Sequence, residues 1–158
     1  MLSQERLQAK YEYRQGCLYY KTGGRNGRRA GSLSDRGYRI VWQDGKPHKE
    51  HRAIWTLLNG PIPDGAEIDH VNGIKDDNRI ENLRLASHGQ NQANTPKYRN
   101  NSSGIKGVSW REDYGVWTAV IQKDGRQRSL GHFKDKQAAA EAYRKAALQL
   151  HGEFTNLG

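Results

Sequence analysis

The segment from Glu67 to Asn91 limits the possible folds of this chain more than any other stretch. Residues 67–71 predict a short strand, and Asn72-Gly73 after them is a strong turn signal. Residues 83–85 alternate in polarity as a returning strand does, and Ser87 is suited to cap a following helix. The segment therefore predicts a β-hairpin that runs directly into a helix.

A carboxylate and an imidazole, those of Asp69 and His70, are neighbours on the first of these strands. Successive side chains of a strand point to opposite faces, so both serve one site only where the strand ends or bends. One geometry that suits both has Asp69 holding a metal at the strand edge and His70 facing a water molecule over a phosphate.

The spacing of the polar residues carries a family resemblance. Asn82 follows His70 by 12 positions, and Asn91 follows Asn82 by 9. With the Asp69-His70 pair, this pattern makes residues 48–94 resemble the HNH nucleases, in the homing-endonuclease branch where an amide replaces the final histidine. The alternative is a surface hairpin whose Asp and Asn residues only form turns.

The resemblance implies a ββα-metal site with assigned roles. His70 would be the general base that takes a proton from the attacking water, and Asn82 would hold its ring. Asp69 and Asn91 would bind one divalent ion that neutralises charge on the phosphate. Oxygen ligands favour Mg²⁺ or Mn²⁺ over zinc. His51 is expected to be structural or to make a helix-terminal hydrogen bond, and the alternative is a phosphate contact.

Charge and composition indicate the partner. The net charge of +9 and the isoelectric point near 9.8 favour a polyanion, and the resemblance makes it double-stranded DNA, bound by a monomer or weak dimer. No run reaches the roughly 18 apolar residues of a membrane span. Cys17 is the single cysteine, so no intrachain disulfide forms. We expect a phage or mobile-element protein in the cytoplasm of a bacterial host.

The charge is unevenly distributed. Residues 1–62 contain 12 Lys and Arg against 5 Asp and Glu, a net of +7, whereas residues 63–94 contain 3 against 6, a net of −3. A bound cation would offset the acidity of the second stretch. Within the basic stretch, Arg25, Arg28 and Arg29 lie in a glycine-rich loop that either contacts DNA phosphates or is simply solvated.

The remaining N-terminal elements are predicted in chain order. A short helix near residues 2–10, with Ser3 as its cap, precedes hairpins over 11–21 and 38–51, and a helix over 51–60 follows. The polar, Pro- and Gly-interrupted residues 95–104 predict a linker. We therefore expect an HNH nuclease domain with N-terminal β-hairpins over 1–94 and a second domain over 105–158.

The C-terminal segment predicts three short strands over 105–111, 115–123 and 126–133, joined in part by the turn Asp124-Gly125. A helix capped by Asp135 follows, with an alanine-rich face. The expected fold class is α+β: an N-terminal ββα-metal (HNH) nuclease domain plus a C-terminal three-stranded antiparallel sheet packed on one helix.

This segment resembles the Apetala-two/ethylene-response-factor DNA-binding domain in Gly107-Val108, Leu130-Gly131, Phe133, the alanine series before Tyr143, and Gly152-Glu153-Phe154. In that family exposed strand residues enter the major groove. The residues carried over by position are Lys106, Ser109, Arg111, Gln122, Gln127 and Ser129. Trp110 and Trp117 are expected to pack in the core.

Two functions compete at this stage. One is a homing-type endonuclease that nicks DNA at a selected site. The other is a non-catalytic, sequence-specific DNA-binding regulator that keeps the hairpin as a scaffold. The presence of Asp69, His70, Asn82 and Asn91 together favours the enzyme.

Overall fold

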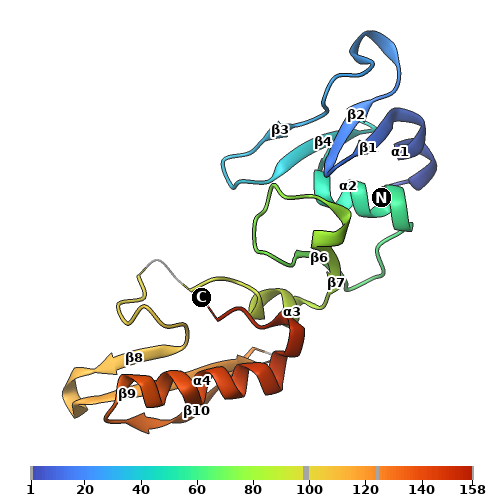
Figure 1. Cartoon of the computed structure of the whole chain (residues 1–158). Helices are drawn as coiled ribbons and strands as arrows, with labels where there is room; N and C mark the ends of the chain where they lie inside the picture. Colours follow the sequence, from blue (N-terminus) through green and yellow to red (C-terminus); the bar gives the residue numbers. More distant parts are fainter. Residues whose placement is uncertain (1, 98–99, 124, 158) are drawn as a thin grey trace. The chain divides into compact units, whose positions relative to one another are not determined.

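The computed structural model describes residues 2–97, 100–123 and 125–157, and it confirms the α+β class. The chain divides into two compact units, Met1–Ser87 and His88–Gly158. Their elements are labelled in Figure 1. The division falls before residue 94, where we expected the domain boundary, so the helix after the central hairpin belongs to the second unit.

The first unit begins with helix α1 (Gln4–Lys10) and the antiparallel hairpin of β1 (Tyr11–Arg14) and β2 (Cys17–Tyr20). These elements were predicted, but the Ser3 side chain makes no capping hydrogen bond. A short 3₁₀ turn, η1 (Gly23–Arg25), follows in the glycine-rich loop.

A three-stranded sheet comes next, in the order β3-β4-β5. The hairpin of β4 (Arg39–Gln43) and β5 (Lys46–Lys49) was predicted, whereas the two-residue strand β3 (Ser32–Leu33) was missed. So short a strand has too few residues to show an alternating pattern, and only its pairing with β4 defines it.

Helix α2 (Glu50–Asn59) ends at Gly60, whose φ of 89° lies in the region that glycine adopts without strain. Its apolar face packs into the core of the first unit, which joins residues from both hairpins, the helices and the central hairpin. The buried apolar residues are Leu7, Tyr11, Leu18, Ala30, Val41, Ala53, Ile54, Leu57, Ile68 and Leu83.

The central hairpin forms as predicted. Strand β6 (Glu67–His70) pairs antiparallel with β7 (Leu83–Ala86), which places Asp69 opposite Arg84 and His70 opposite Leu83. A 3₁₀ turn, η2 (Ile80–Asn82), ends the connection between the strands. Ile68 and Leu83 anchor this hairpin in the core, so its polar residues are held by a packed structure.

The second unit begins with helix α3 (His88–Ala93) and contains a sheet in the order β10-β9-β8. Strands β8 (Val108–Arg111), β9 (Val116–Lys123) and β10 (Arg126–Phe133) are antiparallel, and the turn η3 (Glu112–Tyr114) joins the first two. Asp124 of the second predicted turn lies outside the described residues.

Helix α4 (Lys136–His151) covers one face of this sheet and is followed by the turn η4 (Gly152–Phe154). Asp135 caps the helix as predicted, since its Oδ2 accepts a hydrogen bond from the Ala138 amide at 2.8 Å. Ala139, Tyr143 and Ala147 are buried against the sheet. Small alanines allow the helix to lie close to the strands.

The predicted linker is part of the second unit. Within residues 95–104, Lys97 Nζ donates to the Gly104 carbonyl, and the Ser103 hydroxyl, which is buried, bonds to the Val108 carbonyl. Tyr98 and Arg99 of this segment lie outside the described residues. The local polarity that predicts a linker does not reveal these hydrogen bonds to later residues.

None of the helices among the described residues is long and apolar enough to span a membrane.

Candidate active site

Strand β6 presents Asp69 and His70 at its C-terminal end, with only 4% and 6% of their surfaces exposed. The Nε atom of Arg84 donates to Asp69 Oδ2 at 2.9 Å. This contact follows from the strand register, because directly paired residues project to the same side of a sheet. Arg84 therefore fixes the orientation of the carboxylate and compensates its charge.

The His70 ring is held by a residue that the sequence did not indicate. Its Nε2 lies 2.9 Å from Oδ1 of Asn78, an amide that is 1% exposed. Asn78 in turn donates from Nδ2 to Glu50 Oε2 at 2.9 Å. The imidazole is thus connected through one amide to a carboxylate at the start of α2.

Glu50 is fully buried. Its Oε1 accepts a hydrogen bond from the Leu18 amide at 3.0 Å, and Arg39 Nε lies 3.7 Å from Oε2. Burial raises the pKa of Glu50, and its hydrogen bonds from Leu18 and Asn78 and the positive charge of nearby arginines offset this only in part. Both of its oxygens are therefore engaged by donors.

Two aromatic neighbours surround the imidazole. The buried ring of His51 meets the His70 ring edge-on, with 4.8 Å between centroids, and the Tyr38 ring lies 6.4 Å from His70. Burial lowers the pKa of His51 to about 2, so this ring is neutral. The His51 ring packs against the His70 ring at the edge of the site.

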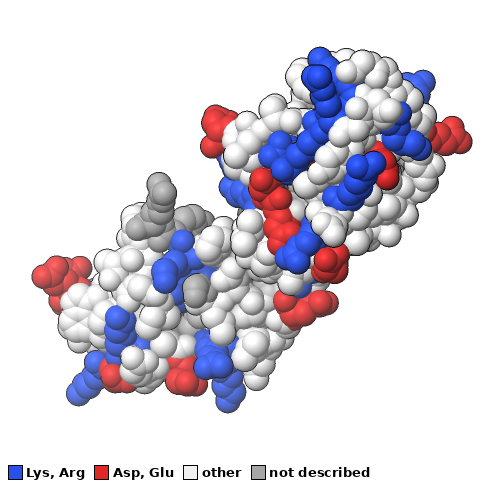
Figure 2. Space-filling view, turned by 45° about the horizontal axis from the view of Figure 1, so that its top comes forward, with Lys and Arg blue, Asp and Glu red and all other residues white. Residues whose placement is uncertain are grey.

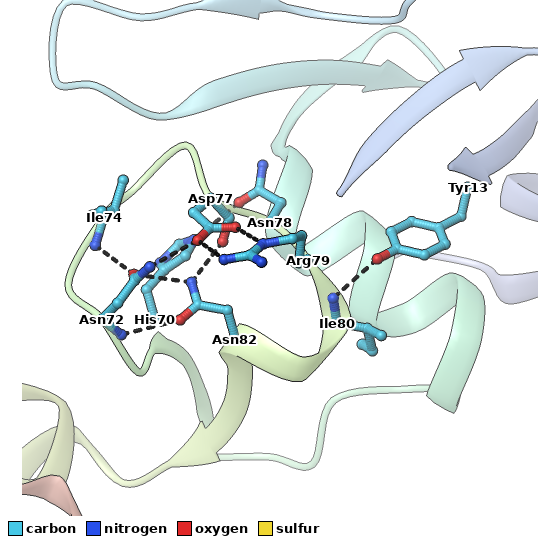
Figure 3. Close-up of polar contacts among 9 residues, drawn as sticks. All are labelled: Tyr13, His70, Asn72, Ile74, Asp77, Asn78, Arg79, Ile80 and Asn82. Carbon is cyan, nitrogen blue, oxygen red and sulfur yellow. Dashed lines mark hydrogen bonds and ion pairs between the residues drawn. The ribbon is translucent and has the colours of Figure 1, made fainter. Parts of the chain in front are cut away.

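The Asn82 side chain bonds to the loop between β6 and β7, whereas the family resemblance assigned it to the His70 ring. Its Nδ2 donates to Asn72 Oδ1 and to the Asp77 carbonyl, and its Oδ1 accepts from the Asn72 amide. Figure 3 shows these bonds beside the separate contact between His70 and Asn78. Asn82 therefore closes the connection between β6 and β7, while Asn78 holds the ring.

An ion pair reinforces the same loop. Two nitrogens of Arg79 each donate at 2.8 Å to an oxygen of Asp77, and Asn72 Nδ2 also donates to Asp77. The Arg79 guanidinium lowers the pKa of the Asp77 carboxyl well below its ordinary range. Tyr13 accepts a hydrogen bond from the Ile80 amide and ties the end of the loop to β1.

Asn91 lies on α3 and is half-buried. Thr95 donates to its backbone carbonyl at 3.4 Å. His88, on the same helix, lies 2.9 Å from Gln92 through its Nε2.

The side chains of Asp69 and Asn91 carry oxygen atoms, which are the ligands that a hard divalent ion prefers. A carboxylate has about four acceptor positions, and Arg84 donates to one oxygen of Asp69. Among the residues that the structure describes, no three His, Cys, Asp or Glu side chains cluster as a metal cage. An ion such as Mg²⁺ needs no such cage, because it retains several water ligands and is held by one or two carboxylates.

The C-terminal sheet presents most of the predicted DNA contacts on one face. Val108 and Ala119 are paired and lie under α4, so residues out of phase with them face away from the helix. This open face carries the exposed residues Ser109, Arg111, Gln122, Gln127 and Ser129. We call these five residues the sheet face. A groove of about 590 Å³ in this unit is lined in part by Ser109, Gln122 and Gln127.

Lys106 does not belong to the sheet face. The half-buried Lys106 donates through Nζ to the carbonyls of Ala93, the last residue of α3, and of Thr95. Burial lowers the pKa of this lysine. The structure therefore places Lys106 as a support for the end of α3, although it also lines the groove.

The arginines of the glycine-rich loop are exposed but not loosely held. Arg28 accepts through its carbonyl from the Tyr20 amide, Arg29 forms a β-bridge with Tyr19, and Arg25 lies 5.7 Å from the Tyr20 ring. Lys and Arg side chains are spread over the visible surface of this unit in Figure 2. The three arginines are thus exposed on a loop whose contacts with Tyr19 and Tyr20 attach it to β2.

Sequence reasoning missed Asn78 and Glu50 as members of the site. Asn78 was hidden within a run of loop-forming polar residues, and Glu50 was assigned to the end of a strand. The one available signal was the position of Glu50 at the start of an apolar helix. This signal is weak, because carboxylates are common in the first turn of exposed helices. The burial of Glu50 depends on packing between segments distant in sequence.

Comparison with known proteins identifies the family. Residues 48–93 match the model of the HNH endonuclease family. The chain is 34% identical to Protein 3.8 of Escherichia phage T7 over 109 residues, covering 69% of this chain and 89% of that protein. It is also 33% identical to an uncharacterised HNH endonuclease, L560, of Acanthamoeba polyphaga mimivirus, over 77% of this chain and 63% of the viral protein. The chain belongs to the HNH endonuclease family.

This member of the HNH family is also similar to a solved structure of the homing endonuclease I-HmuI, in work on the DNA binding and cleavage of that enzyme. The similarity covers 91% of this chain and 85% of that chain, with 18% identity and a TM-score of 0.43. The family match spans the β6–β7 hairpin and α3, and so it includes all four residues of the expected pattern.

Proposed function

We propose that this protein is a homing-type DNA endonuclease that hydrolyses phosphodiester bonds with one divalent ion and His70 as general base. The observation that carries the proposal is the pair of Asp69 and His70 at the end of β6. Asp69 is oriented by Arg84 and the His70 ring by Asn78, within the segment that matches the HNH family. Both side chains are held in place before any substrate binds, as catalysis by positioned groups requires.

Each residue has a distinct role in this proposal. His70 removes a proton from the attacking water. Asp69 and Asn91 bind the ion, and the assignment of Asn91 rests on the family pattern. When bound, Mg²⁺ or Mn²⁺ neutralises charge on the phosphate and on the leaving oxygen. Asn82 keeps the loop of the site closed through its bonds to Asn72 and Asp77.

Double-stranded DNA is the proposed substrate. Residues 1–62 have a net charge of +7 and include the exposed arginines of the η1 loop, which suits phosphate contact. The sheet face offers side chains at fixed register, as base reading in a groove requires. We assign site selection to the C-terminal unit, which carries the sheet face and resembles the Apetala-two domain. We assign cleavage to the segment that matches the HNH family, residues 48–93.

We also propose that a monomer cuts one strand per binding event, because the chain holds one Asp69-His70 pair. A plasmid time course should show open circles before linear product. Linear product without an open-circle stage would contradict nicking.

The decisive test is plasmid cleavage in Mg²⁺ and in EDTA by wild type, His70→Ala and His48→Ala. His48 lies on β5, outside the proposed site, and serves as the matched control. Cleavage should require the metal, and His70→Ala should be about 10²–10⁴-fold slower with nearly unchanged DNA affinity. Cleavage in EDTA, or an active His70→Ala variant, would refute the mechanism.

The competing function is a DNA-binding regulator without catalysis. It is favoured only by the basic charge and the sheet face, which both functions share. Tight binding of a preferred sequence, with no cleavage under any divalent metal, would establish it.

A further inference from the structure

We propose that Glu50, acting through Asn78, selects the tautomer of His70 that carries its proton on Nε2 and its lone pair on Nδ1. Glu50 and Asn78 are thereby positioning residues for the base. The inference rests on the proposed role of His70, but it concerns a property of the free protein that can be measured without DNA or metal.

Three buried side chains form one connected series. Glu50 Oε2 accepts from Asn78 Nδ2 at 2.9 Å, and Asn78 Oδ1 lies 2.9 Å from His70 Nε2. The exposed fractions are 0% for Glu50, 1% for Asn78 and 6% for His70. So little exposure limits replacement of these bonds by water, and each atom must match its partner as donor or acceptor.

The direction of the series is set at its Glu50 end. The Leu18 amide donates to Oε1 and has no acceptor capacity, and the Arg39 guanidinium lies near Oε2. Burial raises the pKa of Glu50, but the Leu18 amide and the Arg29 and Arg39 cations act against it and favour the carboxylate form, which only accepts hydrogen bonds. Asn78 must therefore turn its NH₂ group toward Glu50.

The orientation of Asn78 then determines the proton on His70. With its NH₂ group used by Glu50, the amide presents its carbonyl oxygen to the ring. An oxygen accepts, so His70 Nε2 must donate, and in a neutral imidazole the other nitrogen then holds the lone pair. The edge-on contact with the neutral His51 ring fixes the plane of His70 without supplying a charge.

Glu50→Gln provides a sharp test because it preserves the size of the side chain and replaces one acceptor oxygen with an NH₂ donor. The new amide must keep its oxygen on the Leu18 amide, so its NH₂ group faces Asn78. Asn78 should then turn over and donate to His70 Nε2, which moves the imidazole proton to Nδ1. The measurement is the ¹⁵N chemical shift of the two ring nitrogens of His70, with the ring neutral and without DNA or metal.

Wild type should show the N–H on Nε2, and Glu50→Gln should show it on Nδ1. Glu5→Gln, at an exposed position of α1, is the matched control and should match wild type. The Glu50→Gln protein should also cleave DNA about 10²–10⁴-fold more slowly in single turnover, with DNA affinity retained. A structural role alone would not invert the tautomer.

An Nδ1–H tautomer in wild type would overturn the proposal, as would a folded Glu50→Gln protein that keeps Nε2–H. If Glu50→Gln does not fold, Asn78→Leu removes the amide between Glu50 and His70 at similar side-chain volume. This variant should contain a mixture of the two His70 tautomers. A single Nε2–H tautomer in Asn78→Leu would overturn the proposal. The expected tautomers in a protein that does not cleave DNA would refute the proposed function and leave this inference standing.

Discussion

Replacing Asn82 with alanine should destabilise the first unit by opening the connection between β6 and β7. The Asn82 side chain makes three hydrogen bonds in this loop, at 2.7, 3.0 and 3.1 Å. Each such bond contributes about 1 kcal/mol net, so the loss should be about 2–3 kcal/mol. For a unit of this size, that lowers the melting temperature by roughly 10–20 °C.

Amide hydrogen exchange locates the effect. The Asn72 amide donates to the Asn82 side chain, whereas the Val71 amide donates to the Asn82 backbone carbonyl. In Asn82→Ala the first amide should exchange faster in native conditions, and the second serves as an internal reference. Asn26→Ala, in an exposed loop of the same unit, is the matched control and should melt like wild type.

Two results would refute this reasoning. An unchanged melting temperature together with unchanged Asn72 exchange would show that the three bonds contribute nothing. A stable Asn82→Ala protein that binds DNA but no longer cleaves it would show that Asn82 acts on the reaction directly.

Three further predictions concern other parts of the chain. Arg79 lowers the pKa of Asp77, so the ion pair stabilises the folded state at any pH above the ordinary Asp pKa of 3.8. This contribution is lost as the pH falls through the lower pKa of the folded state. Thermal melts of Asp77→Asn should therefore show destabilisation at pH 7 that shrinks in acid. Gly107→Ala should cost about 3 kcal/mol in urea unfolding of the second unit, because φ is +70° and a Cβ would collide with the Tyr143 ring; an unchanged midpoint would contradict this. Arg111→Ala should relax binding preference by about 1–3 kcal/mol in competition assays if Arg111 reads a guanine, and equal weakening for every sequence would assign it to a phosphate.

Local pattern was sufficient for most elements of this chain. The alternation around Leu83, the Asn72-Gly73 turn signal and the Asp135 cap predicted structures that form as expected. Each depends on interactions within a few residues, so the information lies in the stretch itself. The spacing of Asp69, His70, Asn82 and Asn91 likewise identified the HNH family, because that pattern is written along the chain.

What holds His70 was decided by tertiary structure alone. Asn78 and Asn82 both offer a side-chain amide, and the family resemblance assigned Asn82 to the His70 ring. Packing of α2 beside the loop brings Glu50 to Asn78, 28 residues apart in sequence, and this contact orients Asn78 toward the imidazole. A buried polar group must find its partner wherever the fold supplies one, and only the assembled core determines which groups become buried together.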